Sequence, residues 1–260
     1  MKPTHCQGEN SLSTFSFEAI GYIRSCFPEK FGIPRQPGLV PEAEAVLEIK
    51  PPYSKAEAFN GLDQFSHVWI LFVFHQCYPK RWQSTVRPPR LGGNKRVGVF
   101  ASRSGFRPNT IGQSVVTLVD VSQINNATIL KLRGVDILDG SPVLDIKPYI
   151  PYADSIPEAT AGYAPMPPRK HEVGFSTEAE ATIATLSPDT YPNLQALIIG
   201  LLAQDPRPAY KAGRDTNEYG MCLWDLNVRF SFGAEHIWVR SIEKRTPNSP
   251  TTACSFQPSG

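Results

Sequence analysis

The sequence predicts a mainly β fold, with a β-barrel N-terminal domain and a smaller α+β C-terminal domain. Short apolar segments rich in β-branched and aromatic residues recur over the first 150 residues without long helical patterns between them. That spacing is typical of barrels and sandwiches. The 25 prolines and 19 glycines also favour a turn-rich fold. A Pro/Ala/Gly-rich linker at 154–169 precedes a change of pattern. We therefore expect domains at 14–168 and 169–244, with disordered polar tails at 1–13 and 245–260.

Strands of the first domain are expected where polar and apolar residues alternate, or where a short apolar run is bounded by turn residues. The run at 66–75, SHVWILFVFH, is the most hydrophobic and is predicted to be a central strand buried on both faces. A short helix should begin at Ser54, with Glu57 completing a capping box. Turns are expected at Asn125-Asn126 and Asp139-Gly140. The predicted strands are 15–25, 45–50, 66–75, 97–101, 115–121, 128–135 and 143–146.

The second domain is expected to combine two helices with a β-hairpin. Thr177 and Glu180 predict the start of a helix that ends near Leu186, and a second helix is expected at 191–203, before Pro206. A short strand is predicted at 173–175. The hairpin should pair 222–232 with 236–242.

Composition limits the possible functions. The net charge of +2 is too small for nucleic-acid binding through overall charge, so any such contact must use a local patch. The five cysteines are widely spaced and form no CxxC pair, which argues against a zinc or disulfide framework and predicts a reducing, cytoplasmic location. The first residues lack an apolar signal core, and the longest apolar runs are too short to span a bilayer. No HExxH or other metal-spaced histidine set occurs, so no metal is expected.

A long acid-free stretch lies at the centre of the predicted barrel. The 56 residues between Asp63 and Asp120 contain neither Asp nor Glu but hold eight of the 26 lysines and arginines. Such a local positive field suits phosphates or carboxylates. Arg87 and Arg90 of this stretch are predicted to bind an anionic substrate.

The segment at 102–112, SRSGFRPNTIG, follows a predicted strand and carries Arg103, Arg107 and Asn109. Polar side chains on an irregular segment after a strand are typical of a binding loop, and arginine forks suit carboxylate or phosphate oxygens. The alternative is a solvated, positively charged turn. Neither a P-loop nor a GxGxxG between a strand and a helix is present, which disfavours those nucleotide sites.

Four further segments have both a functional and a structural interpretation. Asp136 and Asp139 could hold a cationic amine or ribose hydroxyls, or accept a proton, although Asp-Gly is more often a simple turn. DPRPAY could present Arg207 and Tyr210 to RNA, or it could only stop a helix. PRQP at 34–37 presents Arg35 and Gln36, or merely connects strands. His67 and His75 could be functional or satisfied structural histidines.

Taken together and in order, PRQPG, FSHVWILFVFH, RPPRLGGN, VGVFASRSGFRPN, IG, DILDG, PVLDIKPYIPYAD and DPRPAY resemble the TrmO (YaeB, TsaA-like) family. The resemblance covers about residues 15–243. It implies an S-adenosylmethionine-dependent tRNA methyltransferase with a β-barrel donor domain, acting on N6 of threonylcarbamoyladenosine beside the anticodon of threonine tRNA. The sequence departs from the expected pattern at Thr110, where a second proline is expected.

The resemblance also implies roles for individual residues. Arg107 and Asn109 would lie near the acceptor base, and Arg103 or Arg107 could hold the threonyl carboxylate. The C-terminal DPRPAY segment would contact tRNA, and a homodimer is expected from the family. The residues that would line the donor pocket are Pro34, Arg35, Gln36, His67, Val68, Arg103, Val115, Asp136, Ile137, Leu138 and Asp139.

Two other function classes remain open from sequence alone. The chain could be a non-catalytic RNA-binding barrel that uses its basic loop only for the RNA backbone. It could also be a hydrolase that uses His67 with Asp139, although no nucleophile is placed beside that pair.

Overall fold

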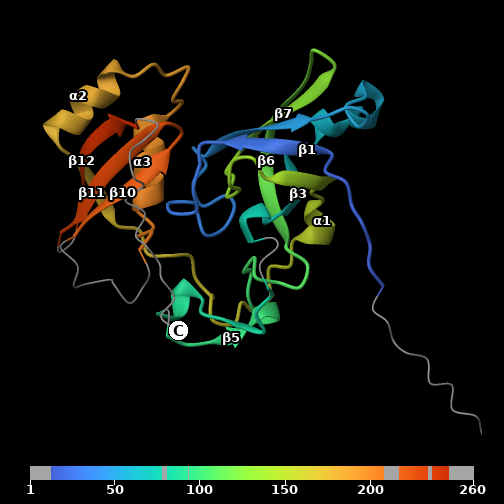
Figure 1. Cartoon of the computed structure of the whole chain (residues 1–260), viewed down its shortest axis with the longest axis horizontal. Helices are drawn as coiled ribbons and strands as arrows, with labels where there is room; N and C mark the ends of the chain where they lie inside the picture. Colours follow the sequence, from blue (N-terminus) through green and yellow to red (C-terminus); the bar gives the residue numbers. More distant parts are fainter. Residues whose placement is uncertain (1–12, 78–80, 93, 208–216, 234–235, 246–260) are drawn as a thin grey trace, which may run out of the picture.

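The structure is a computed structural model that describes residues 13–77, 81–92, 94–207, 217–233 and 236–245. In these residues a closed β-barrel lies beside a four-stranded sheet that carries two helices (Figure 1). The predicted mainly β class with a barrel is confirmed. The predicted tails fall almost wholly outside the described residues, and the division of the chain near residue 168 stays a prediction.

Within the described residues, six strands close the barrel in the order β1-β2-β7-β6-β3-β8, with β8 pairing back to β1. Every neighbouring pair is antiparallel. Asn125 and Asn126 join β6 to β7 with positive φ angles of 48° and 64°, as expected for a tight hairpin turn. The bounds are β1 Gly21–Ser25, β2 Glu44–Ile49, β3 His67–Val73, β6 Ile111–Ile124, β7 Ala127–Arg133 and β8 Pro142–Pro148.

The centre of the barrel is filled by apolar side chains. Ile23, Leu47, Ile70 and Leu130 are fully buried, one from each of four strands. The prediction that the 66–75 strand is buried on both faces is wrong, because only alternate residues of β3 are fully buried. A small barrel covers only the inward face of each strand, so its apolar run packs on one side and meets loops on the other. The filled centre leaves no room there for a ligand.

Several predicted boundaries shift in the structure. β1 begins at Gly21 rather than at residue 15, and the predicted 97–101 strand is β5 (Val97–Gly98) followed by a 3-10 helix. The capping box at Ser54 is wrong, since the Ser54 hydroxyl donates instead to the Asn126 carbonyl at 2.6 Å. Among the described strands, β5 pairs with β4 (Thr85–Val86) alone. The 3-10 helices are Ala56–Phe59, Leu62–Gln64, His75–Cys77, Pro89–Leu91 and Val99–Ala101, and α1 is Pro151–Asp154.

The second sheet has the order β10-β11-β12-β9, with β9 parallel to β12. The first helix beside it begins after Ser176, whose hydroxyl accepts from the Ala179 amide, so Ser176 rather than Thr177 is the cap. No described helix combines the length and apolar character needed to cross a membrane. The bounds are β9 Glu172–Phe175, α2 Thr177–Thr185, α3 Leu194–Leu202, β10 Glu218–Leu223, β11 Leu226–Phe232 and β12 His236–Lys244.

The predicted 222–232 strand is in fact two strands, β10 and β11, with a turn between them at Trp224 and Asp225. Trp224 has a φ of 49°, which is uncommon for a residue with a large side chain. Its amide donates to the Cys26 carbonyl at 2.9 Å, and its ring meets Tyr191 edge-on. Tertiary contacts therefore hold tryptophan at a position of positive φ in this turn.

The segment at 26–40 packs the barrel against the second sheet. The Phe31 ring stacks on Tyr219 and Phe230 at centroid distances of 6.4 and 6.5 Å. Gly200 of α3 lies so near Val40 that a Cβ there would come within 2.8 Å of the valine Cγ1. Buried residues of both parts belong to one continuous hydrophobic cluster. The two sheets therefore share a packed boundary.

Candidate functional site

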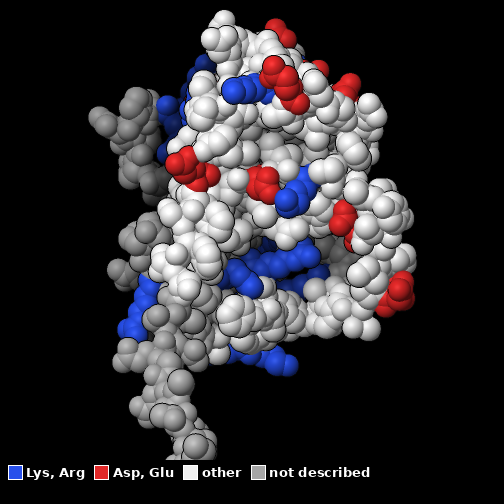
Figure 2. All heavy atoms as spheres, turned by 90° about the vertical axis from the view of Figure 1, so that its right-hand side faces the viewer, with Lys and Arg blue, Asp and Glu red and all other residues white. Residues whose placement is uncertain are grey.

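A cavity of about 760 Å³ lies at the rim of the barrel, beside the first residues of β6. Its walls come from the 33–37 loop, the end of β3, the 102–107 segment, the start of β6 and the segment after β7. Figure 2 shows a hollow on this side of the molecule in which Lys and Arg side chains gather, with Asp and Glu on the surface around it. Its volume is in the range of small-molecule sites.

The lining of the cavity is strongly cationic. Lys30, Arg35, Arg103 and Arg107 all contribute to it, whereas Asp136 is its acid among the described lining residues. Such an excess of positive charge in a partly enclosed site favours anionic ligands. The single carboxylate gives the same site one place for a cation.

Asp136 is held at the cavity wall by Ser114. The Ser114 hydroxyl, itself 1% exposed, donates to Asp136 Oδ1 at 2.6 Å. Burial raises the pKa of Asp136 from the ordinary 3.8 to about 6, although the serine bond, the Asp136 amide and the charge of Arg103 act in the opposite direction. Asp136 therefore changes charge near pH 6 in the absence of a ligand.

Arg103 and Gln36 connect two walls of the cavity. The Arg103 guanidinium donates to the Gln36 side-chain oxygen, which joins the 102–107 segment to the 33–37 loop. The arginine charge also acts on Asp136. The loop between the two prolines at 34 and 37 is therefore linked to the acidic part of the site.

Arg107 fixes the turn before it. Its Nη1 donates to the carbonyls of Ser102 and Val99 at 2.8 and 3.2 Å, and its guanidinium lies 5.5 Å from the centre of the Phe100 ring. Both hydrogen bonds use the same terminal nitrogen. Arg107 lines the cavity while these contacts hold its guanidinium in place.

An aromatic wall faces these charges. Phe72 and Phe74 meet edge-to-face at 5.1 Å, and Trp69 lies on the same strand. Gly112 is the cross-strand partner of Phe72, and a Cβ at Gly112 would overlap the Phe72 ring. Glycine is therefore required there for the ring to lie over β6 and line the cavity.

A second polar group on the wall combines His75, whose functional and structural interpretations the sequence left open, with residues that the sequence analysis did not single out. The Lys30 ammonium donates to Cys77 Sγ at 3.5 Å, and the Ser141 hydroxyl lies 3.3 Å from His75 Nδ1. Burial lowers the pKa of His75, and the Lys30 charge lowers it further, so this histidine favours its neutral form.

Ser114 was also missed, although the sequence carries a signal for it. In IGQSVV, Ser114 occupies an inward position between Gly112 and Val116, which are both buried. A small polar residue at a buried position of an apolar strand requires a polar partner. Asp136 is that partner.

The structure brings eight of the predicted site residues together at the cavity. Asn109 is exposed outside it, and Arg87 and Arg90 belong to the neighbouring β4–β5 region. Arg207 lines a smaller cavity nearby, and Tyr210 lies outside the described residues. The eight that line the main cavity are Pro34, Arg35, Gln36, Arg103, Arg107, Val115, Asp136 and Leu138.

Four predicted donor-pocket residues lie elsewhere. Val68 and Ile137 are fully buried in the core. Asp139 accepts from the Ser25 amide at 2.9 Å at the end of β1. His67 is exposed and lies within hydrogen-bonding distance of Ser66 and Thr117. None of these contacts joins His67 to Asp139, so the structure gives no support to a hydrolase that uses this pair.

Comparison with known proteins gives matches over nearly the whole chain. A family model described as "tRNA-methyltransferase O N-terminal domain" matches residues 22–155, and a model of the "TrmO C-terminal domain" matches residues 168–245. An Escherichia coli protein named "tRNA (adenine(37)-N6)-methyltransferase" is 50% identical over 236 residues, which is 90% of this chain and 100% of that protein.

Two further matches concern structure and ligand. The crystal structure of TrmO from Pseudomonas aeruginosa superposes with a TM-score of 0.75 at 44% identity and covers 90% of this chain and 100% of that one. A Pyrococcus abyssi protein named "Probable S-adenosyl-L-methionine-binding protein" is 38% identical over 138 residues, which is 53% of this chain and 70% of that protein.

Proposed function

Since the chain belongs to the TrmO family and is an S-adenosylmethionine-dependent methyltransferase of adenine 37 in tRNA, we propose that its acceptor is N6 of threonylcarbamoyladenosine in threonine tRNA. The observation that supports this acceptor is the charge of the cavity, where four cationic side chains face one acid. The donor carries two positive groups and one carboxylate. The surplus arginines therefore suit an acceptor that brings a carboxylate of its own.

The cavity fits the donor in size and in chemistry. Its volume of about 760 Å³ exceeds that of a nucleoside linked to an amino acid. Asp136 supplies a carboxylate for a cationic group, and the rings of Phe72, Phe74 and Trp69 suit an adenine face or a sulfonium. When bound, the donor supplies a methyl group on a positively charged sulfur.

The protein's part in the reaction is alignment and charge stabilisation. Asp136 holds the cationic part of the donor, and Arg103 keeps the 33–37 loop closed over it through Gln36. The acceptor nitrogen gains the methyl group and releases its proton, while the sulfur keeps the electron pair of the broken bond as a thioether. We propose that the substrate's own carboxylate, held by Arg107, takes that proton.

Arg107→Ala is expected to lower kcat/KM on the modified tRNA by about 10–100-fold, the effect of losing a charged hydrogen bond. The donor Kd should stay within about twofold of the wild type. Converting the threonyl carboxylate of the tRNA to an amide should lower the kcat/KM of the wild type by a similar factor. The same conversion should not lower the kcat/KM of Arg107→Ala any further. Single-turnover kinetics of both enzymes on both tRNAs measures these effects.

The amide substrate distinguishes a carboxylate contact from a disturbed turn. If Arg107→Ala lowers kcat/KM by the same factor on both tRNAs, Arg107 only supports the 99–102 turn. If calorimetry with the wild type and S-adenosylmethionine gives no heat, the cavity is not a donor site, and a non-catalytic RNA-binding barrel becomes the better interpretation.

The β4–β5 region next to the cavity is proposed to contact the tRNA. Trp82 and Phe100 are 48% and 74% exposed, and Arg96 donates to the Thr85 hydroxyl beside them. Exposed aromatic rings between arginines suit unstacked bases and phosphates. Arg87 and Arg90 belong to the same region, although Arg90 also donates to the Met166 carbonyl. Arg207 is only 6% exposed, so we assign its side chain to the local turn rather than to RNA.

Replacing Phe100 or Trp82 by alanine is expected to weaken tRNA binding by about tenfold each, which corresponds to the loss of one stacked base. Donor binding and thermal stability should stay unchanged, because both rings are exposed. Filter binding with threonine tRNA tests this, with Phe17→Ala as the matched control, since Phe17 is also exposed at 69% but precedes β1. Equal tRNA affinity of all three variants would contradict the proposed contact of Phe100 and Trp82 with tRNA.

Three broader predictions belong to the same proposal. The barrel domain is proposed to end near residue 168 and the tRNA-contacting domain to cover 169–244. The enzyme is proposed to work in the cytoplasm, where its tRNA is. It is proposed to act as a homodimer, because a single small barrel offers little surface for a tRNA.

A further inference from the structure

A short turn after α3 is held rigid by its own side chains. Asp205 has a φ of 47° and accepts from the Arg207 amide at 3.1 Å. The Arg207 side chain binds the same carboxylate with two nitrogens, at 2.9 and 2.8 Å. Its guanidinium lies 3.2 Å from the centre of the Phe232 ring of β11. Pro206 between them restricts the backbone further, so the turn has few alternative conformations.

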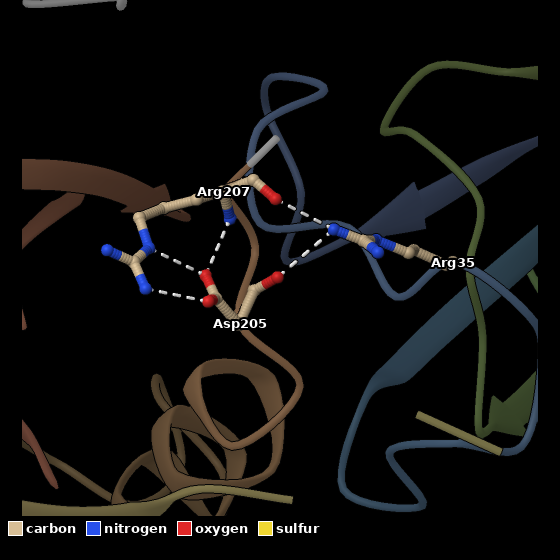
Figure 3. Close-up of polar contacts among 3 residues, drawn as sticks. All are labelled: Arg35, Asp205 and Arg207. Carbon is tan, nitrogen blue, oxygen red and sulfur yellow. Dashed lines mark hydrogen bonds and ion pairs between the residues drawn. The ribbon is translucent and has the colours of Figure 1, made fainter. Parts of the chain in front are cut away.

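This turn presents two carbonyl oxygens to the barrel domain. Arg35 Nη2 donates to the Arg207 carbonyl at 2.9 Å and to the Asp205 carbonyl at 3.1 Å (Figure 3). One nitrogen makes both bonds. Burial lowers the pKa of Arg35, and nearby Arg90 lowers it further, while the Asp205 charge acts against this. The two carbonyl dipoles thus help to keep the guanidinium charged in a partly buried position.

Arg35 also belongs to the wall of the main cavity. Its neighbours Pro34, Gln36 and Pro37 line the cavity with it, and Gln36 is bonded to Arg103. The charge of Arg103 in turn acts on Asp136. A continuous set of contacts therefore runs from the second sheet, through the turn and Arg35, to Gln36 and Arg103, and the charge of Arg103 reaches the acid of the site.

We propose that Arg35 is a positioning residue through which the turn 205–207 of the second domain holds the 33–37 wall of the donor cavity in its binding conformation. This rests on the proposed function, because it takes the cavity as the donor site. Arg35 acts through the loop and does not bind the donor carboxylate. The second domain thereby sets the affinity for the methyl donor as well as contacting tRNA.

The test uses calorimetric Kd values for S-adenosylmethionine with the full-length chain. Arg35→Ala is expected to raise the donor Kd by about tenfold, and Arg207→Ala, which frees the turn without touching the cavity wall, should raise it by a similar factor. The double variant should be no weaker than the weaker single variant, because both changes break the same link. Arg35→Lys should stay within about threefold of the wild type, since one ammonium can bond to both carbonyls.

The matched control is Glu44→Ala. It removes the Asn193–Glu44 hydrogen bond of 3.2 Å, which also joins the barrel to the second domain but lies away from the cavity. Its donor Kd should equal that of the wild type. If Arg207→Ala does not fold, Pro206→Gly loosens the same turn and should shift the Kd in the same direction.

Two outcomes would overturn the proposal. In the first, Arg35→Lys binds S-adenosylmethionine as weakly as Arg35→Ala does, while Arg207→Ala binds it normally. This would mean that the Arg35 guanidinium binds the donor directly. In the second, the effects of the two single variants multiply in the double variant. If the wild type gives no heat of binding with S-adenosylmethionine, the result contradicts the proposed function rather than the role of Arg35.

Discussion

Asp136→Asn is expected to weaken binding of S-adenosylmethionine by about 10–100-fold at pH 7.5 and, at the same time, to stabilise the folded protein. The loss of affinity corresponds to one charged contact to the donor. The gain in stability is expected because burial of Asp136 raises its pKa from 3.8 to about 6. A shift of this size means that the ionised carboxylate costs the folded state on the order of 3 kcal/mol. Calorimetry and urea denaturation measure the two effects separately.

The pH dependence follows from the same shift. Because the folded state holds the proton more tightly than the unfolded state, the free energy of unfolding should fall as pH rises from about 4 to 6 and then level off. Donor affinity should change in the opposite direction and rise through pH 6. Asp136→Asn should remove this pH dependence both from the free energy of unfolding and from the donor affinity. Asp145→Asn makes the same change of charge at an exposed carboxylate paired with Lys147 and should remove neither. Retained donor affinity in Asp136→Asn would contradict the assigned role.

Phe230→Ala is expected to destabilise the protein by about 3–5 kcal/mol and to lower Tm by roughly 10 °C. Phe230 is fully buried, and its ring lies 5.7–6.5 Å from the rings of Phe232, Tyr219 and Phe31. Because Phe31 belongs to the segment that precedes the cavity wall, the cavity left by truncation should also loosen the boundary between the two sheets. Differential scanning calorimetry gives the change in Tm.

The control for this prediction is Phe100→Ala. That ring is 74% exposed, so its removal should change the free energy of unfolding by no more than about 0.5 kcal/mol. If Phe230→Ala also changed the free energy of unfolding by no more than about 0.5 kcal/mol, the aromatic cluster around Phe230 would contribute little to the fold.

Local patterns were sufficient to predict the barrel and most of its strands. The predicted strands at 115–121 and 128–135, with a turn at Asn125-Asn126 between them, correspond to the β6–β7 hairpin, although β6 is longer than predicted. The turn at Trp224 could not be predicted, because only its contacts with Cys26 and Tyr191 explain a tryptophan with positive φ. Local rules describe propensity, and tertiary contacts override it there.

The candidate site, too, could be predicted from sequence only in part. The acid-free stretch and the Asp136 segment pointed to residues that do line one cavity. Sequence could not separate Asp136 from Asp139, because only the fold turns one toward the cavity and the other toward the Ser25 amide. Nor could it show that Arg35 bonds to carbonyls about 170 positions further along the chain. Such long-range partners depend on how the two sheets pack.

The missing side chain at Gly112 has a consequence for the evolution of this pocket. The Phe72 ring occupies the space where a Cβ at 112 would lie, so any larger residue at 112 requires a smaller one at 72. A lineage that acquires alanine or valine at 112 must also acquire a smaller residue at 72. Positions 72 and 112 should therefore co-vary among descendants, and a pair such as Leu with Ala would reshape the cavity that both positions line.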